Sequence, residues 1–272
     1  MKHSLLAVLV IGLGLAGCSK QSPEAPAAGT PPPAAAATGT KATASAEKLQ
    51  ADAGTETSDR AEATLEKAAA MPESGQLPGG KWKAGVHYKP IVPAQGTGVE
   101  PGQVEVLEVF WLGCSHCYAL DPFLENWQKV KAPYVKFTRV PVMWGPAHRA
   151  HARLFYTLQA LGKLDTLFGP TFDEIQTRGN MLIDNSDDKS LKMQLAFAKA
   201  RGITEADYTR EYNGFFVNSN LQRAEDLTRR YKVEGVPNII VNGKYQTDVG
   251  MAGGHEQLIA LINDLTAFEK KR

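Results

Sequence analysis

The sequence predicts an α/β sheet domain with an inserted helical subdomain, preceded by a leader and a long tether. Three observations lead to this fold class. Residues 104–110 and 238–249 are β-rich, and the segment between them has apolar residues at helical spacing. Residues 19–80 lack almost every residue type that builds a core. We therefore expect the folded domain at 81–272, with the helical insertion at about 145–232.

Composition places the chain among ordinary globular proteins. Of its 272 residues, 43% are hydrophobic and 22% are charged. Lys and Arg number 30 against 29 Asp and Glu, and loss of Lys2 with a cleaved leader would leave 29 against 29. Because nucleic-acid binding requires an excess of basic charge, we expect no nucleic-acid partner. Three cysteines are too few for a disulfide-stapled small scaffold or a four-cysteine zinc site.

Residues 1–17 are predicted to be a signal peptide. Lys2 precedes an apolar run from Leu5 to Leu15, which is short for a membrane span. The sequence Leu15-Ala16-Gly17-Cys18 resembles a bacterial lipobox, which implies a lipoprotein acylated on Cys18. That resemblance places the protein in the bacterial periplasm, on the outer leaflet of the inner membrane or the inner leaflet of the outer membrane. A plain secretory leader and a membrane anchor are the alternatives.

Residues 18–80 are predicted to be the lipidated cysteine and a disordered tether rich in Ala, Pro and Thr. The 62 residues from 19 to 80 contain no Phe, Trp, Tyr, Val, Ile or Cys. Such a segment cannot bury enough apolar surface to offset the entropy of ordering its chain. Random-coil scaling gives it a span of about 45 Å, which would hold the folded domain clear of a lipid surface.

The first part of the folded segment is predicted to be strand, helix and strand. Residues 104–110 alternate partially and favour a strand. Residues 134–140 predict a second strand, ended by Pro141. Pro122 lies inside the helix between them and is expected to kink it. That helix is indicated by one apolar face, formed by Leu120, Phe123, Leu124, Trp127 and Val130.

The middle of the segment is predicted to be helical. Apolar residues recur at helical spacing in 147–161, 190–200 and 221–227. Thr204 begins a sequence typical of a helix N-terminus. These helices form the predicted insertion.

The end of the segment is predicted to be a hairpin and a last helix. Residues 238–241 favour a strand, Asn242-Gly243 a tight turn, and 244–249 the return strand. One apolar stripe then predicts the helix, through Leu258, Ile259, Ile262, Leu265 and Phe268.

The sequence Cys114-Ser115-His116-Cys117 lies where the first strand passes into the following helix. Unpaired N–H groups and the helix dipole at such a terminus stabilise a thiolate. His116 can add a positive charge or a donor. We therefore expect Cys114 to be an exposed nucleophile and Cys117 a buried resolving partner in a redox-active pair. An inert disulfide is one alternative, and another is a zinc site completed by His148 and His151.

Residues 104–117, 134–140 and 231–245 together resemble the DsbA family of thiol:disulfide oxidoreductases, which have a thioredoxin fold. Two stretches match the motifs of that family. They are Leu107-Glu108 followed by Cys114-Ser115-His116-Cys117-Tyr118, and Val233-Glu234-Gly235-Val236-Pro237-Asn238 followed by Val241-Asn242-Gly243-Lys244-Tyr245. The resemblance implies that Pro237 follows a cis bond and faces the disulfide. It also implies that the backbone of Val236 and Pro237 contacts substrate. An ordinary trans proline at the end of the preceding helix is the alternative.

The resemblance further implies that Glu108 is a buried acid beneath the cysteines and that Arg139 is its basic partner. Burial of Glu108 in an apolar strand is costly unless the carboxyl is paired or protonated. The alternative is that Glu108 lies on a solvated face. Ser115 departs from the family, which typically has proline at this position, so the strength of the oxidant stays open.

The predicted function is an envelope oxidoreductase that oxidises cysteine pairs of secreted proteins through a Cys114–Cys117 disulfide. Family resemblance implies a DsbB-type membrane quinone reductase as reoxidant, and we expect no organic cofactor, no metal and a monomer. A reductase or isomerase with the same fold is one alternative. A redox-inert, chaperone-like binding lipoprotein is another.

Overall fold

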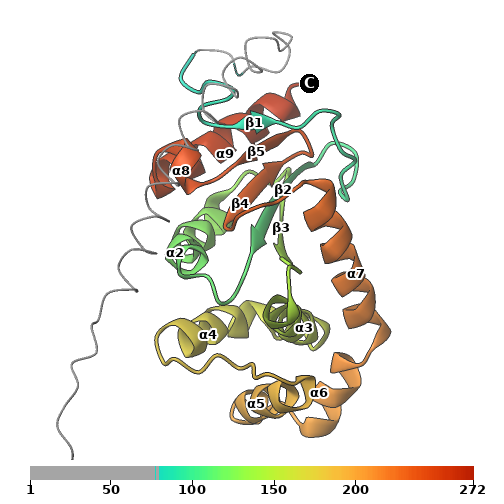
Figure 1. Cartoon of the computed structure of the whole chain (residues 1–272). Helices are drawn as coiled ribbons and strands as arrows, with labels where there is room; N and C mark the ends of the chain where they lie inside the picture. Colours follow the sequence, from blue (N-terminus) through green and yellow to red (C-terminus); the bar gives the residue numbers. More distant parts are fainter. Residues whose placement is uncertain (1–76, 78–79) are drawn as a thin grey trace, which may run out of the picture. The chain divides into compact units, whose positions relative to one another are not determined.

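The computed structural model describes residue 77 and residues 80–272, which contain a five-stranded sheet in the order β1-β5-β4-β2-β3 (Figure 1). The strands are β1 (Lys89–Pro90), β2 (Val104–Phe110), β3 (Val135–Pro141), β4 (Asn238–Val241) and β5 (Tyr245–Thr247). The helices are α2 (Ser115–Val130), α3 (Pro146–Ala160), α4 (Leu164–Gln176), α5 (Asp187–Lys199), α6 (Glu205–Tyr212), α7 (Phe215–Arg230), α8 (Val249–Ala252) and α9 (His255–Lys270). The predicted leader, tether and Cys18 lie outside the described residues.

Strand β2 is the central element of the sheet. It pairs in parallel with β3 and antiparallel with β4, and all seven of its residues are buried. Helices cover both faces: Val104 and Val106 belong to one apolar cluster, and Leu107 and Val109 to another. The parallel register sets Glu108 directly beside Arg139 on β3.

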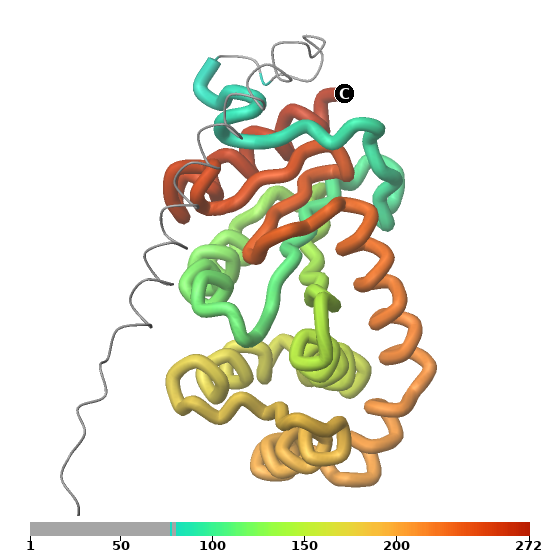
Figure 2. The backbone as a smooth tube through the Cα atoms, in the orientation of Figure 1, coloured from blue at the N-terminus to red at the C-terminus, as the bar shows by residue number. Residues whose placement is uncertain are grey.

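The helices are divided between these two faces. Helices α2 and α9 contribute apolar residues to the cluster on one face, and helices α3 to α7, which follow β3, contribute to the other cluster. In Figure 1, α3 to α6 lie below the sheet and α7 rises beside it. Figure 2 shows how α7 brings the chain back from these helices to the sheet at β4. The predicted insertion therefore corresponds to five helices between two strands of one sheet.

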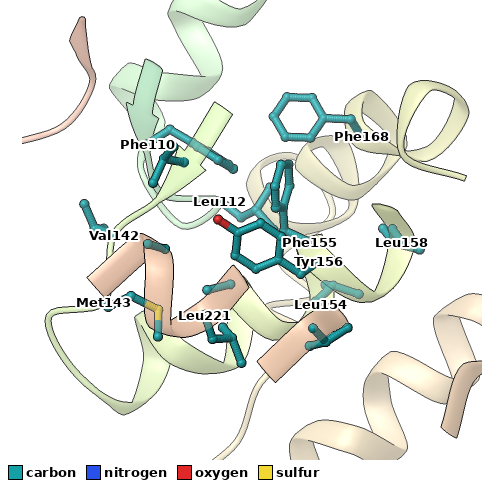
Figure 3. Close-up of a cluster of buried hydrophobic side chains, with 14 of the residues drawn as sticks. Phe110, Leu112, Val142, Met143, Leu154, Phe155, Tyr156, Leu158, Phe168 and Leu221 are labelled. Carbon is teal, nitrogen blue, oxygen red and sulfur yellow. The ribbon is translucent and has the colours of Figure 1, made fainter. Parts of the chain in front are cut away.

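An aromatic cluster joins the end of β2 to the helical insertion (Figure 3). The Phe110 ring lies 5.2 Å from that of Phe155 on α3 and 5.5 Å from that of Phe168 on α4, both edge-on. Edge-to-face pairs of this kind are favoured by the ring quadrupoles. Because Phe110 lies four residues before Cys114, the packing of the insertion fixes the base of the cysteine loop.

Several element boundaries differ from those predicted from the sequence. The return strand β5 ends at Thr247 rather than 249, because the Asp248 side chain accepts the Met251 N–H at 2.8 Å and caps α8. Strand β3 includes Pro141, which needs no ladder donor at a sheet edge. Helix α4 lies outside the three stretches with predicted helical spacing, and Gly169-Pro170 interrupts its apolar pattern. No helix formed by the described residues is long and apolar enough to cross a membrane.

Candidate active site

Cys114 is the N-cap residue of α2 and Cys117 lies in its first turn. The backbone N–H of Cys117 donates to Cys114 Sγ at 3.4 Å. Cys114 is partly exposed, whereas the relative exposure of Cys117 is 0%. Both thiols are free, so the structure represents the dithiol form. One sulfur can therefore meet an external reactant while the other is enclosed.

The two thiols have opposite acidities. The pKa of Cys114 is lowered to about 6, first by a hydrogen bond from the Cys117 thiol and then by the backbone N–H groups of Cys117 and His116. The positive charge of His116 is the smallest of these contributions, and its side chain is exposed. Burial raises the pKa of Cys117, and the neighbouring Cys114 and Glu108 raise it further. At neutral pH the dithiol form therefore carries its thiolate on Cys114.

The loop before β4 lies against this pair. The Val236–Pro237 peptide bond is cis, which is the geometry predicted for Pro237. Cys114 Sγ lies 3.5 Å from the Val236 carbonyl oxygen, to which it donates when the thiol is protonated. A groove of about 680 Å³ opens beside the loop, and its lining includes His116, Ala119, Val236, Pro237 and Met251.

Glu108 is buried beneath the cysteines, with a relative exposure of 1%, so it does not lie on a solvated face. Arg139 Nε donates to Glu108 Oε2 at 2.9 Å, which is the predicted pair. The same guanidinium also donates to Asp121 at 2.6 Å and Glu125 at 2.9 Å, and it lies 4.1 Å from the Phe168 ring centroid. Burial raises the pKa of Glu108 to about 7 and that of Asp121 to about 6.

The sequence does not predict Asp121 and Glu125 as site residues. They lie four residues apart on α2 and thus on one side of the helix, which was the only available signal. The side facing Arg139 could not be derived without knowing how α2 packs against β3.

The zinc alternative finds no support in the described part of the chain. No three His, Cys, Asp or Glu side chains gather there in an arrangement that could hold a metal ion. The His148 ring lies 4.4 Å from that of Trp111, and His151 Nε2 contacts the Met181 carbonyl oxygen at 2.7 Å.

A cysteine pair at a helix start, facing a cis-proline loop on a mixed sheet, defines a thiol–disulfide exchange site. A family model described as "DSBA-like thioredoxin domain" matches residues 124–263, a range that begins inside α2 beyond the cysteine pair. The chain belongs to the DsbA family of thioredoxin-fold proteins.

Curated relatives and solved structures agree with this assignment. The thiol:disulfide interchange protein DsbA of Pseudomonas syringae pv. tomato is 34% identical over 188 residues, covering 69% of this chain and 85% of that protein. The protein of the same name from Azotobacter vinelandii is 33% identical, with the same coverage. The crystal structure of Pseudomonas aeruginosa DsbA has a TM-score of 0.62 at 30% identity, covering 70% of this chain and 95% of that one.

These comparisons confirm the thioredoxin-like fold and the prediction of a protein thiol:disulfide oxidoreductase. The redox-inert binding module and the reductase or isomerase are not favoured by them.

Proposed function

We propose that the enzyme oxidises cysteine pairs in secreted or envelope proteins by donating the Cys114–Cys117 disulfide. The observation that carries this proposal is the contrast between the two thiols, with the pKa of Cys114 at about 6 and that of Cys117 raised. A dithiol form that holds a stabilised thiolate makes its disulfide a stronger oxidant.

The reaction proceeds by two thiolate attacks. A substrate thiolate attacks Cys114 Sγ, the Cys114–Cys117 bond breaks, and Cys117 leaves as a thiolate. A second substrate thiolate then attacks the substrate sulfur of the mixed disulfide, and Cys114 leaves with the electron pair. The substrate loses two electrons and becomes a disulfide, and the enzyme gains them as a dithiol. The stabilised thiolate makes Cys114 a good leaving group.

In this proposal the buried acid provides the proton for Cys117. Glu108 has a pKa of about 7, so a large share of it is protonated near neutral pH. Its charge also raises the pKa of Cys117, which indicates that the two groups interact. Proton transfer from Glu108 to the departing Cys117 thiolate moves the buried negative charge from the sulfur to the carboxyl group. Arg139 then stabilises the Glu108 carboxylate through their 2.9 Å contact.

The groove beside Pro237 is the proposed substrate site. An extended segment next to the attacking cysteine would lie against the backbone of Val236 and Pro237, with His116 at the rim. The 3.5 Å distance between Cys114 Sγ and the Val236 carbonyl oxygen supports this placement, because a substrate bonded to that sulfur would lie next to the Val236 backbone.

We place this activity in the bacterial periplasm, with the chain anchored through lipid on Cys18. The lipobox-like sequence before Cys18 supports the anchor, and the tether supports a domain held away from the membrane. A DsbB-type membrane quinone reductase would reoxidise the dithiol of a monomeric enzyme. Labelling with a fatty-acid analogue tests the anchor, and Cys18→Ser should abolish labelling and membrane recovery.

An equilibrium titration of the full chain against glutathione tests the oxidase function. The expected potential lies well on the oxidising side of the glutathione couple, and reduced substrate protein should gain disulfides when the oxidised enzyme is added. A potential close to that of thioredoxin would instead assign a reductase. In that case Ser115 would be the first position to exchange for proline.

A further inference from the structure

Helix α4 of the insertion contacts the active-site segment on both sides of the cysteine pair. Gln176 Nε2 donates to the Leu112 carbonyl oxygen at 2.8 Å, two residues before Cys114. Asp173 accepts the Tyr118 hydroxyl at 2.8 Å, one residue after Cys117. Because Asp173 and Gln176 are three residues apart, both contacts come from one face of α4.

The loop held by Gln176 contacts both sulfur-bearing residues. The Cys114 N–H donates to the Trp111 carbonyl oxygen at 3.0 Å. A hydrogen bond from the Trp111 backbone partly offsets the rise in the pKa of Cys117. A Cβ on Gly113 would lie 2.4 Å from the Trp111 ring, so that ring rests directly on the backbone before Cys114. Leu112 lies between these contacts, with its side chain buried in the core that includes α4. A rotation of the Leu112 peptide would therefore displace groups next to both cysteines.

We infer that Gln176 is a positioning residue for Cys114: its hydrogen bond to the Leu112 carbonyl fixes the loop that presents the thiol to the start of α2. The inference rests on the proposed function for its catalytic consequence. Its first readout, the reactivity of Cys114, requires no substrate.

The physical basis is the alignment of donors around Cys114 Sγ. A thiolate at a helix N-terminus is stabilised only while the backbone N–H groups of the first turn point at the sulfur. The Leu112 carbonyl oxygen lies in a part-buried loop, and Gln176, 64 residues later in the chain, donates a hydrogen bond to it. Removal of that donor leaves the peptide free to turn toward solvent. The packing of the insertion on the sheet therefore affects the stability of the Cys114 thiolate.

The test uses Gln176→Met in the full chain. Methionine has a similar length and helix propensity but cannot donate to the carbonyl. The pH dependence of Cys114 alkylation by iodoacetamide is followed by mass spectrometry of the peptide that contains it. At about pH 5 we expect a rate about threefold below wild type, which corresponds to a pKa higher by about half a unit. The equilibrium with glutathione should shift toward the disulfide form by a similar factor.

Gln159→Met is the matched control, since it makes the same change at an exposed position on α3. It should react as wild type. A wild-type profile in Gln176→Met, or an equal loss in Gln159→Met, would overturn the inference. If wild type itself reacts as an ordinary thiol, the proposed function fails first and separately, because the inference concerns the ratio of variant to wild type.

Gln176→Glu keeps the inference testable if the methionine variant does not fold. The introduced carboxyl can donate to the Leu112 carbonyl when protonated and repels it when ionised. Alkylation relative to wild type should therefore be near normal at about pH 4 and fall as the carboxyl ionises. A constant ratio over that range contradicts the inference.

Discussion

Replacement of Cys117 is expected to change the acidity of Cys114 more than any replacement of His116. The Cys117 thiol donates the hydrogen bond that contributes most to lowering the Cys114 pKa, whereas the positive charge of His116 contributes least. Cys117→Ala removes this donor and leaves the helix terminus and the backbone N–H groups in place. Cys117→Ser retains a hydroxyl donor at the same position.

The size of the effect follows from the strength of hydrogen bonds to charged groups. Such a bond contributes about 1.5–3 kcal/mol, which corresponds to about one to two pKa units. Cys117→Ala should therefore raise the Cys114 pKa from about 6 toward 7 to 8. His116→Ser removes an exposed charge that solvent screens, and we expect a shift of about half a unit or less.

The assay is the pH profile of Cys114 alkylation in the three variants and in the reduced wild type. The expected order of Cys114 pKa values is wild type, His116→Ser, Cys117→Ser and Cys117→Ala, from lowest to highest. A larger shift in His116→Ser than in Cys117→Ala would refute the reasoning. Identical profiles for the serine and alanine variants would also refute it, because they would show that the donor at this position has no effect.

Three further outcomes are expected. The free energy of unfolding of the dithiol form, relative to that of the disulfide form, should rise as the pH rises from about 6 to 9, and this gain should be absent below about 6. The reason is that the folded-state pKa of Cys114 lies below its ordinary value of 9.0. Urea unfolding of both forms across this range measures it, and a constant difference contradicts it. Arg139→Met leaves the buried Glu108 carboxylate without its guanidinium, so it should cost about 3–5 kcal/mol at pH 8 and less at pH 5. Equal losses at the two pH values would exclude the ion pair as the cause. Phe155→Ala should cost about 3–5 kcal/mol in urea unfolding, whereas Phe215→Ala at an 88% exposed position should change stability by about 0.5 kcal/mol or less.

Features set by local sequence could be predicted. The β2 run is mostly apolar because helices cover both faces of the sheet and bury all seven residues, and its predicted bounds are those observed. Thr204 accepts the Asp207 N–H through its side chain, as its capping pattern indicated. The hairpin turn at Asn242-Gly243 has positive φ at both residues, a conformation that these residue types tolerate best.

Features set by contacts between distant segments could not be predicted. Gln176 gave no signal in the sequence, because its function depends on α4 packing against a loop 64 residues earlier. The grouping of three carboxylates around Arg139 similarly depends on how α2 crosses β3. The resemblance indicated Glu108 and Arg139 as a pair, yet it did not include Asp121 and Glu125, which share the guanidinium.

His116 is close to Cys114 in sequence, but helical geometry gives Cys117 the larger effect on the Cys114 pKa. Residues two apart on a helix point to different sides, whereas residues three apart share a face. Cys117 therefore lies beside Cys114, and the His116 side chain points into solvent. The Cys117 thiol can donate only after the disulfide has been broken, because neither sulfur carries a proton while they are bonded to each other. The largest stabilisation of the Cys114 thiolate thus exists in the dithiol form alone, which favours reduction of the enzyme and hence oxidation of its substrate.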